Sequence, residues 1–216
     1  MKIGIIGAGN MGRTLGTRWA QLGHHVMFSA RDASKARAAA SAAGALATAG
    51  DGDAAAAFGD AVLYTVRGVL PSQLLREPAS LARKVVIDCN NSDFDAARGE
   101  FAPPPVPAFA EQLAHDVPGA RVVQAFNTIP HVVLALPRER LAPCRISVFL
   151  CSDDAAAKAT VAGLAGELGL VAVDSGGLAR ARLVDGVVDF IRFHIAGMGR
   201  GPLTTISLDS VPEDAR

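Results

Sequence analysis

The chain has 216 residues, of which 50% are hydrophobic and only 5% are aromatic. Its 21 basic and 21 acidic side chains cancel, so the formal net charge is zero. This composition excludes a disordered chain and provides no overall positive field for nucleic acid or anionic lipid. We therefore expect one large folded domain, or one domain with a small appendage, and neither a nucleic-acid nor a membrane partner.

The cysteines and the hydropathy pattern indicate the compartment. Cys89, Cys144 and Cys151 are odd in number and form no CxxC pair, so neither a disulfide framework nor a metal site is expected. A reducing, cytoplasmic setting fits best. The N-terminal segment lacks the features of a signal peptide, and no apolar run of about 18 residues predicts a transmembrane helix.

Short apolar runs alternate with helical patterns along most of the chain. Strands are predicted at 2–6, 25–29, 45–48, 61–66, 84–88, 121–125, 146–150 and 170–173, and helices at 10–22, 33–43, 53–58, 108–115, 154–168 and 178–196. A proline-rich loop is predicted over 89–107. The alternation predicts an α/β fold with a doubly wound parallel sheet of the Rossmann type.

We expect two parts of unequal size. Residues 1–174 would form the Rossmann domain, and residues 175–216 a small C-terminal helical extension. The predicted last helix carries Leu183, Val187, Phe190, Ile191 and His194 on one face, which favours a contact with a second copy.

A glycine-rich turn follows the first predicted strand and opens the first predicted helix. It consists of Gly7, Ala8, Gly9, Asn10, Met11 and Gly12. In the dinucleotide-binding fingerprint the first glycine allows the tight turn, the second admits a pyrophosphate and the third lets the helix pack against the strand. The helix N-terminus then presents free N–H groups to the phosphates. The turn predicts dinucleotide binding.

The tip of the second predicted strand indicates which dinucleotide is bound. Ser29, Arg31 and Lys35 can together hold a 2′-phosphate, through a hydroxyl, a planar guanidinium and an ammonium group. NADPH is therefore preferred over NADH. Asp32 keeps NADH open, because a carboxylate in this region usually accepts hydrogen bonds from the ribose hydroxyls.

Distinctive side chains also follow three other strands, at the edge where open parallel sheets bind ligands. They are Thr65, Val66 and Arg67; Cys89, Asn90 and Asn91; and Asn127, Thr128, Ile129, Pro130 and His131. We expect Thr65, Val66, Arg67 and Asn127 to contact the cofactor. His131 is a weak candidate for catalysis, since histidine titrates near neutral pH. No catalytic residue is assigned firmly.

With these motifs the chain resembles the NADPH-dependent reductases of the deazaflavin coenzyme F420. The resemblance rests on the glycine turn, on Arg31 and Lys35, on the run 127–130 and on C-terminal stretches such as 151–154, 175–178 and 197–199. It implies a homodimer that holds the deazaflavin beside the nicotinamide, with Asn127, Thr128, Ile129 and Pro130 near the acceptor. Asn127 and Arg67 replace the histidine and the proline of some family members.

Hydride transfer between NADPH and a flat, flavin-like acceptor needs mainly positioning, because the cofactors carry the chemistry. The resemblance therefore makes coenzyme F420 the first candidate for the small-molecule redox acceptor. Three alternatives stay open: a non-catalytic NADP-binding or sensor module, a reductase of a small imine or ketone, and a reductase of FMN or a quinone. We expect the acceptor to lie on the cofactor domain, covered by the last helix or by a partner subunit.

Overall fold

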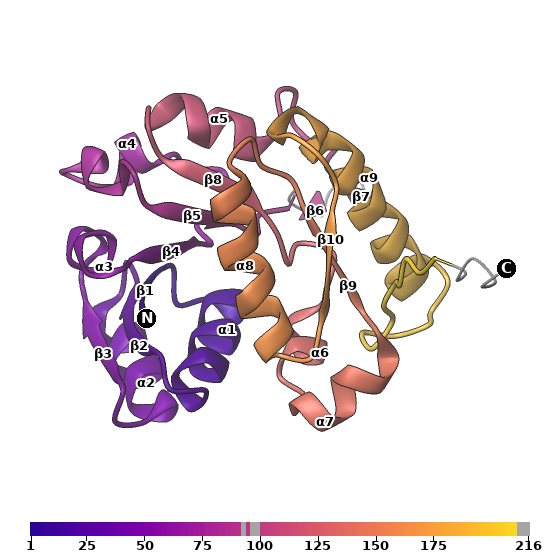
Figure 1. Ribbon diagram of the computed structural model, residues 1–216, viewed down its shortest axis with the longest axis horizontal. Helices are drawn as coiled ribbons and strands as arrows, with labels where there is room; N and C mark the ends of the chain where they lie inside the picture. The colour runs from indigo at the N-terminus through magenta and orange to yellow at the C-terminus, as the bar shows by residue number, and fades with distance from the viewer. Residues whose placement is uncertain (92–93, 96–99, 211–216) are drawn as a thin grey trace, which may run out of the picture.

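The computed structural model describes residues 1–91, 94–95 and 100–210 of the chain. Its centre is a sheet of six parallel strands in the order β3-β2-β1-β4-β5-β8 (Figure 1). These are β1 (Lys2–Ile6), β2 (His25–Ser29), β3 (Ala47–Gly50), β4 (Ala61–Tyr64), β5 (Val85–Asp88) and β8 (Arg121–Gln124). The order reverses between β1 and β4, the point at which such sheets bind ligands. The predicted doubly wound Rossmann sheet is confirmed.

The helices agree closely with the predicted pattern. The longer ones are α1 (Asn10–Gln21), α2 (Ala33–Ala43), α3 (Gly52–Phe58), α5 (Phe109–Asp116), α8 (Ala155–Glu167) and α9 (Ala181–Arg192). Three short helices were not predicted, α4 (Pro71–Leu74), α6 (His131–Leu134) and α7 (Arg138–Leu141). The bounds of β1, β2 and α2 match the prediction residue for residue, whereas β3 begins two residues later than expected.

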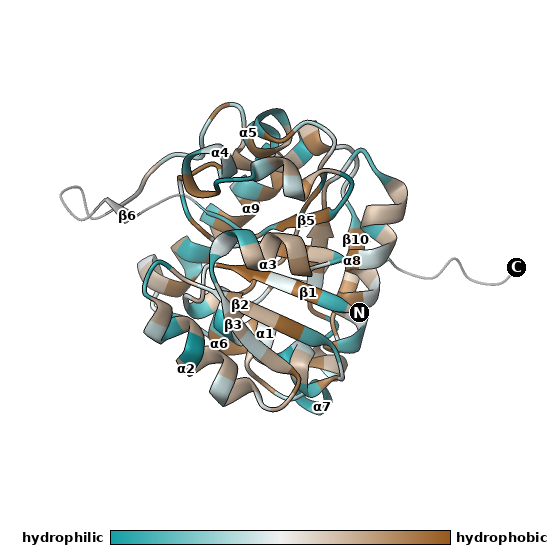
Figure 2. Cartoon of the chain, turned by 90° about the vertical axis from the view of Figure 1, so that its left-hand side faces the viewer, coloured by the Kyte–Doolittle hydropathy of each residue, from teal (hydrophilic) through white to brown (hydrophobic). Residues whose placement is uncertain are grey.

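Neighbouring residues of the strands supply two hydrophobic cores, one on each face of the sheet. Ile5 and Leu63 belong to the core that also contains side chains of α1, α2 and α8. Ile6 and Val62 belong to the core that contains side chains of α3, α5 and α9. A parallel sheet that is buried on both faces has nearly continuous apolar strands, and Figure 2 shows β1 and β5 in hydrophobic colours.

The last two strands form a separate sheet. β9 (Ser147–Leu150) and β10 (Val171–Asp174) pair in parallel with each other. An antiparallel bridge between Gln124 and Cys151, with backbone N···O distances of 3.0 and 3.2 Å, joins them to the main sheet. The expectation that these strands continue the parallel sheet is therefore corrected, because β9 runs in the opposite direction to β8.

The predicted loop over 89–107 contains a short antiparallel hairpin of β6 (Phe94–Asp95) and β7 (Glu100–Phe101). The prediction of a loop without strands was wrong at these four residues. Residues 92–93 and 96–99 of this loop, and 211–216 of the predicted C-terminal extension, lie outside the described residues.

The predicted last helix is divided into three segments. A 3₁₀ turn (Leu178–Arg180) precedes α9, and a π-helical turn (Phe193–Gly197) follows it. The predicted apolar face is exposed at Leu183 and Phe190, by 67% and 56%, and buried at Ile191. The buried face is the adjacent stripe of Ala181, Val184, Asp185, Val188 and Ile191. It contains a carboxylate, which a hydrophobic pattern would not select.

Candidate functional site

The glycine turn is held between β2 and β4. Gly7 has a φ of 105°, which favours glycine over residues with a side chain. The N–H groups of Gly7 and Ala8 both donate to the Ser29 carbonyl oxygen, at 3.0 and 2.9 Å. The Thr65 hydroxyl donates to the Gly7 carbonyl oxygen at 2.7 Å. The turn predicted at Gly7 therefore has a clear geometry, and Thr65, which was predicted as a cofactor contact, also supports this turn.

The same turn leaves one side of the helix start open. A Cβ atom at Gly12 would collide with the Gly7 carbonyl, whereas a Cβ at Gly9 would meet no atom within 4 Å. Gly9 is the N-cap of α1 and provides no capping side chain, and the first turn of α1 contains no acidic residue. The first N–H groups of the helix and its positive dipole end therefore face an open space that suits a phosphate.

The tip of β2 differs from the prediction at Ser29. This side chain is only 2% exposed, and its hydroxyl donates to the Ile5 carbonyl oxygen at 2.9 Å. Ser29 thus supports the strand end and does not present its hydroxyl to a ligand, which corrects its assignment to a 2′-phosphate. Arg31 and Lys35 are both exposed, just beyond the same strand.

Asp32 caps the next helix. Its Oδ1 accepts hydrogen bonds from the backbone N–H and the hydroxyl of Ser34, at 2.8 and 2.7 Å. These bonds hold the pKa of Asp32 below its usual range. The carboxylate that had kept NADH open is therefore occupied at the N-terminus of α2, and this favours a cofactor with a phosphate near Arg31.

A cleft of about 1080 Å³ runs from the glycine turn along the carboxyl ends of the strands. The predicted residues that line it are Gly9, Asn10, Met11, Thr65, Arg67, Asn127, Thr128, Ile129, Pro130 and His131. Residues of α9 close the other side, among them Val188 and Ile191. α9 therefore forms one wall of this cleft. Val66 does not line the cleft and packs against the hydrophobic core instead.

The loop after β8 reaches this cleft through a residue in the left-handed conformation, Phe126. Phe126 has a φ of 65°, and its buried ring meets Trp19 edge to face at 5.9 Å between centroids. The next carbonyl, of Asn127, accepts from Asn91 Nδ2 at 2.9 Å. Three oxygen atoms here are buried and have no hydrogen-bond partner among the described residues: Asn91 Oδ1, Asn127 Oδ1 and Thr128 Oγ1. Since buried polar atoms are normally paired, these three fit a ligand with complementary polar groups.

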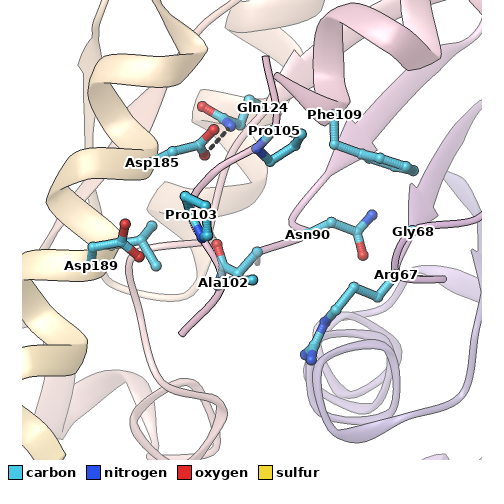
Figure 3. A pocket seen from close by; sticks show the side chains of 12 residues that line it. Arg67, Gly68, Asn90, Ala102, Pro103, Pro105, Phe109, Gln124, Asp185 and Asp189 are labelled. Atoms are coloured by element: carbon cyan, nitrogen blue, oxygen red, sulfur yellow. Dashed lines mark hydrogen bonds between the residues drawn. The ribbon is translucent and has the colours of Figure 1, made fainter. Parts of the chain in front are cut away.

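The cleft continues into a second pocket of about 720 Å³ under α9 (Figure 3). Arg67, Asn90, Asn91 and Val188 line both cavities. The segment after β7 and the start of α5 supply apolar walls, including Pro103, Pro105 and Phe109. The two cavities together form one path from the helix N-terminus to the buried face of α9.

Burial perturbs two carboxyl groups in this region: Asp185 lines the second pocket, and Asp88 is fully buried beside Asn90, which lines both cavities. Burial raises the pKa of Asp88 to about 7 and that of Asp185 to about 6. Asp88 Oδ1 accepts from the backbone N–H and the side-chain amide of Asn90, at 3.0 and 2.7 Å. Asp185 Oδ1 accepts from Gln124 Nε2 at 2.8 Å and from Asn127 Nδ2 at 3.4 Å.

Reasoning from the sequence missed Asp185 and Gln124. The available signal was the acidic residue within the apolar run 184–188, on a stripe with Ala181 and Val188. The expected candidate, His131, begins α6 and is only partly buried at the cleft. Cys89 also lines the cleft, but its thiol is buried and burial raises its pKa.

The described residues contain no group of three or more histidine, cysteine, aspartate or glutamate side chains arranged to hold a metal ion. Across the same part of the chain, no helix has the length and apolar character needed to span a membrane.

Comparison with known proteins gives the relationships of this chain. Residues 2–92 match the family described as NADP oxidoreductase, coenzyme F420-dependent. A solved structure from Arthrobacter sp. FB24, assigned as an F420-dependent NADP reductase, is 27% identical, with a TM-score of 0.81 over 97% of this chain and 100% of the other. The hypothetical protein SMa0349 of Sinorhizobium meliloti is also 27% identical, with a TM-score of 0.66 over 83% and 86% of the two chains.

A curated relative extends the comparison to larger proteins. Metalloreductase STEAP3 of Rattus norvegicus is 30% identical over 187 residues, which are 86% of this chain and 36% of the relative. The chain therefore spans about a third of the length of that relative.

Proposed function

Because residues 2–92 match the family described as NADP oxidoreductase, coenzyme F420-dependent, we propose that the chain transfers a hydride between NADP(H) and a flat, flavin-like acceptor. Coenzyme F420 is the first candidate for that acceptor. One observation carries the proposal: a continuous cleft joins the open N-terminus of α1 to unpaired polar atoms of the 127–128 loop beneath α9. Two flat reactants need such a path to meet face to face.

Different residues would bind the three parts of the nucleotide. The backbone of Gly9, Asn10 and Met11 would hold the pyrophosphate at the start of α1. Arg31 and Lys35 would hold the 2′-phosphate, without Ser29, whose hydroxyl is used within the strand. The nicotinamide would then lie across the ends of β4 and β5. When bound, NADPH supplies the hydride, and the protein supplies position and exclusion of water.

The acceptor would lie beyond the nicotinamide, between the 127–130 loop and α9. Asn127, Thr128, Ile129 and Pro130 all line the cleft there. The apolar walls at Pro103, Pro105 and Phe109 suit a flat ring system.

We also propose a cytoplasmic homodimer. Cys89, Cys144 and Cys151 are all free thiols, which suits a reducing compartment. The outer side of α9 and the segment that follows it expose large apolar side chains, namely Leu183, Phe190, Phe193, Met198, Leu203 and Leu208. Such an exposed group of apolar side chains is typical of a protein contact, and a second copy would bury it.

Stopped-flow mixing of NADPH-loaded protein with a deazaflavin, FMN or a quinone tests the proposal. We expect rapid loss of NADPH absorbance with the deazaflavin and slower loss with FMN or the quinone. If NADPH is oxidised with FMN or the quinone but not with the deazaflavin, the protein is still a reductase, but the deazaflavin is not its acceptor. Tight NADPH binding without oxidation by any of the three would instead support a sensor module and contradict the proposal.

A further inference from the structure

We propose that Asp185 is a catalytic proton donor, which protonates the acceptor at the atom that receives electrons when the hydride adds beside it. The inference rests on the proposed function and deepens it, because it defines the class of acceptor. That class contains compounds whose reduction takes up one hydride and one proton, such as a conjugated C=N or C=O system.

The position of Asp185 carries the argument. It lies on the buried face of α9 and lines the pocket beyond the 127 loop, on the acceptor side of the cleft (Figure 3). Asn127 lines the main cleft and donates to Asp185 Oδ1 at 3.4 Å. One side chain therefore connects the expected hydride-transfer site to the carboxyl group.

The hydrogen bonds of Asp185 orient the group. Gln124 Nε2 and Asn127 Nδ2 both donate to the same atom, Oδ1, from the end of β8 and the loop that follows it. These contacts fix the carboxyl plane, and Oδ2 is then the oxygen positioned to carry the proton. The neighbouring Asp189 differs, because it faces Arg192 at 3.9 Å.

The surroundings of Asp185 make it easier to protonate than an exposed aspartate. Burial is the largest of the effects that together raise its pKa to about 6. Asp189 and Glu111 also raise the pKa, whereas the Gln124 hydrogen bond and Arg192 lower it. The ionisable groups facing it are Asp189 and Arg192 on α9, Glu111 on α5, Asp88 at the end of β5 and Cys151 after β9. A carboxyl group with a pKa near neutrality is suited to general acid catalysis.

The step balances without any further reactant. The hydride from NADPH forms a C–H bond at the acceptor carbon, and NADP⁺ is left. The π-electron pair displaced from that carbon shifts along the conjugated system to its nitrogen or oxygen, which forms a bond to the Asp185 proton. The resulting carboxylate then regains a proton from water that enters the cleft.

Two acceptors separate proton donation from positioning. A deazaflavin needs a hydride and a proton, whereas 10-methylacridinium, a flat ring cation, becomes neutral on accepting the hydride alone. We expect Asp185→Asn to slow single-turnover reduction of the deazaflavin by about 10²–10⁴-fold. The same variant should reduce 10-methylacridinium at the rate of the unsubstituted protein, after subtraction of the uncatalysed reaction. Equal losses with both acceptors would overturn the role as an acid.

The pH profile provides a second measurement. The rate of deazaflavin reduction by the unsubstituted protein should fall as the pH rises through about 6. This declining limb of the pH–rate profile should vanish in Asp185→Asn. Asp189→Asn is the matched variant one helical turn away. It should keep the limb and move it to lower pH, since it removes a charge that raises the pKa of Asp185. A limb that persists in Asp185→Asn but is lost in His131→Ala would overturn the proposal.

A measurement without turnover completes the test. In the unsubstituted protein, one infrared carbonyl band of a protonated carboxyl should titrate through about pH 6, and Asp185→Asn should lose it. The band of Asp88, whose pKa is about 7, should remain in the variant. Asp185→Glu should restore part of the deazaflavin rate and regain such a band, which checks the inference if the asparagine variant folds poorly. If the unsubstituted protein reduces neither acceptor, the proposed function fails; if it reduces the deazaflavin and Asp185→Asn does so equally fast, only this inference fails.

Discussion

The side-chain amide of Gln124 donates to the carboxylate of Asp185 across 2.8 Å, although the two residues are 61 positions apart. Gln124 ends β8, and Asp185 lies on the buried face of α9. The contact joins the edge of the six-stranded sheet to the helix that covers the cleft. It also influences the chemistry, because this hydrogen bond lowers the pKa of Asp185 against the effect of burial.

Gln124→Leu should therefore raise the pKa of Asp185 above its value of about 6. The decline in deazaflavin reduction with rising pH should move to higher pH, since Asp185 would hold its proton longer. The measurement is a pH series of single-turnover rates. The dissociation constant for NADPH, measured by calorimetry, is the control and should stay constant, because Gln124 lies outside the main cleft. An unmoved pH limb would show that this hydrogen bond does not tune the acid.

Arg31→Ala should weaken NADPH much more than NADH. Loss of a charged contact to the 2′-phosphate should cost about 2–3 kcal/mol. The KM for NADPH should rise accordingly, with little change for NADH, which lacks this phosphate. Arg37→Ala removes another exposed guanidinium from α2 and serves as the matched control. Equal effects of Arg31→Ala on both cofactors would contradict the assignment of Arg31 to the 2′-phosphate.

Asp88→Asn should remove a pH dependence of folding. Burial raises the pKa of Asp88 to about 7, from 3.8 for an unperturbed group, so the folded chain binds an extra proton between these values. This contribution to stability is complete below pH 3.8 and is lost as the pH rises through about 7. The free energy of unfolding of the variant, relative to the unsubstituted protein, should therefore rise by about 2–3 kcal/mol from pH 5 to pH 8.

Urea unfolding at pH 5 and pH 8 measures this difference. The asparagine oxygen can keep both hydrogen bonds from Asn90, so the local geometry should survive the exchange. Glu139→Gln, at an exposed position of α7, is the control and should show no such change between the two pH values. A free-energy difference for Asp88→Asn that is equal at both pH values would contradict the raised pKa.

Phe190→Glu should convert the proposed dimer into a monomer. Phe190 and Leu183 are 56% and 67% exposed on the outer side of α9, so a charge there would be buried without a partner in the interface. Sedimentation velocity of the variant should give the mass of one chain, with the helical signal retained. Arg37→Glu, on an exposed part of α2, is the control and should remain dimeric. A monomeric unsubstituted protein would contradict the proposed homodimer.

Much of the fold follows from local signals in the sequence. The apolar run Lys2–Ile6, the turn Gly7–Gly12 and the exact extent of α2 are each encoded within a few residues. Gly7 requires a positive φ and Gly12 a close approach to the turn, and both demands appear as glycines in the sequence. Periodicity and turn chemistry are local, so they allow strands, helices and the dinucleotide turn to be predicted.

The sequence did not determine which side chains face the ligand, because that depends on contacts between distant elements. Ser29 stands at the right strand tip, yet its hydroxyl turns inward to Ile5. The helix α9 presents to the core the stripe that contains Asp185, and it leaves Leu183 and Phe190 outside. Only packing against β8 and the 127 loop decides that rotation, and with it the position of a carboxyl group in the cleft.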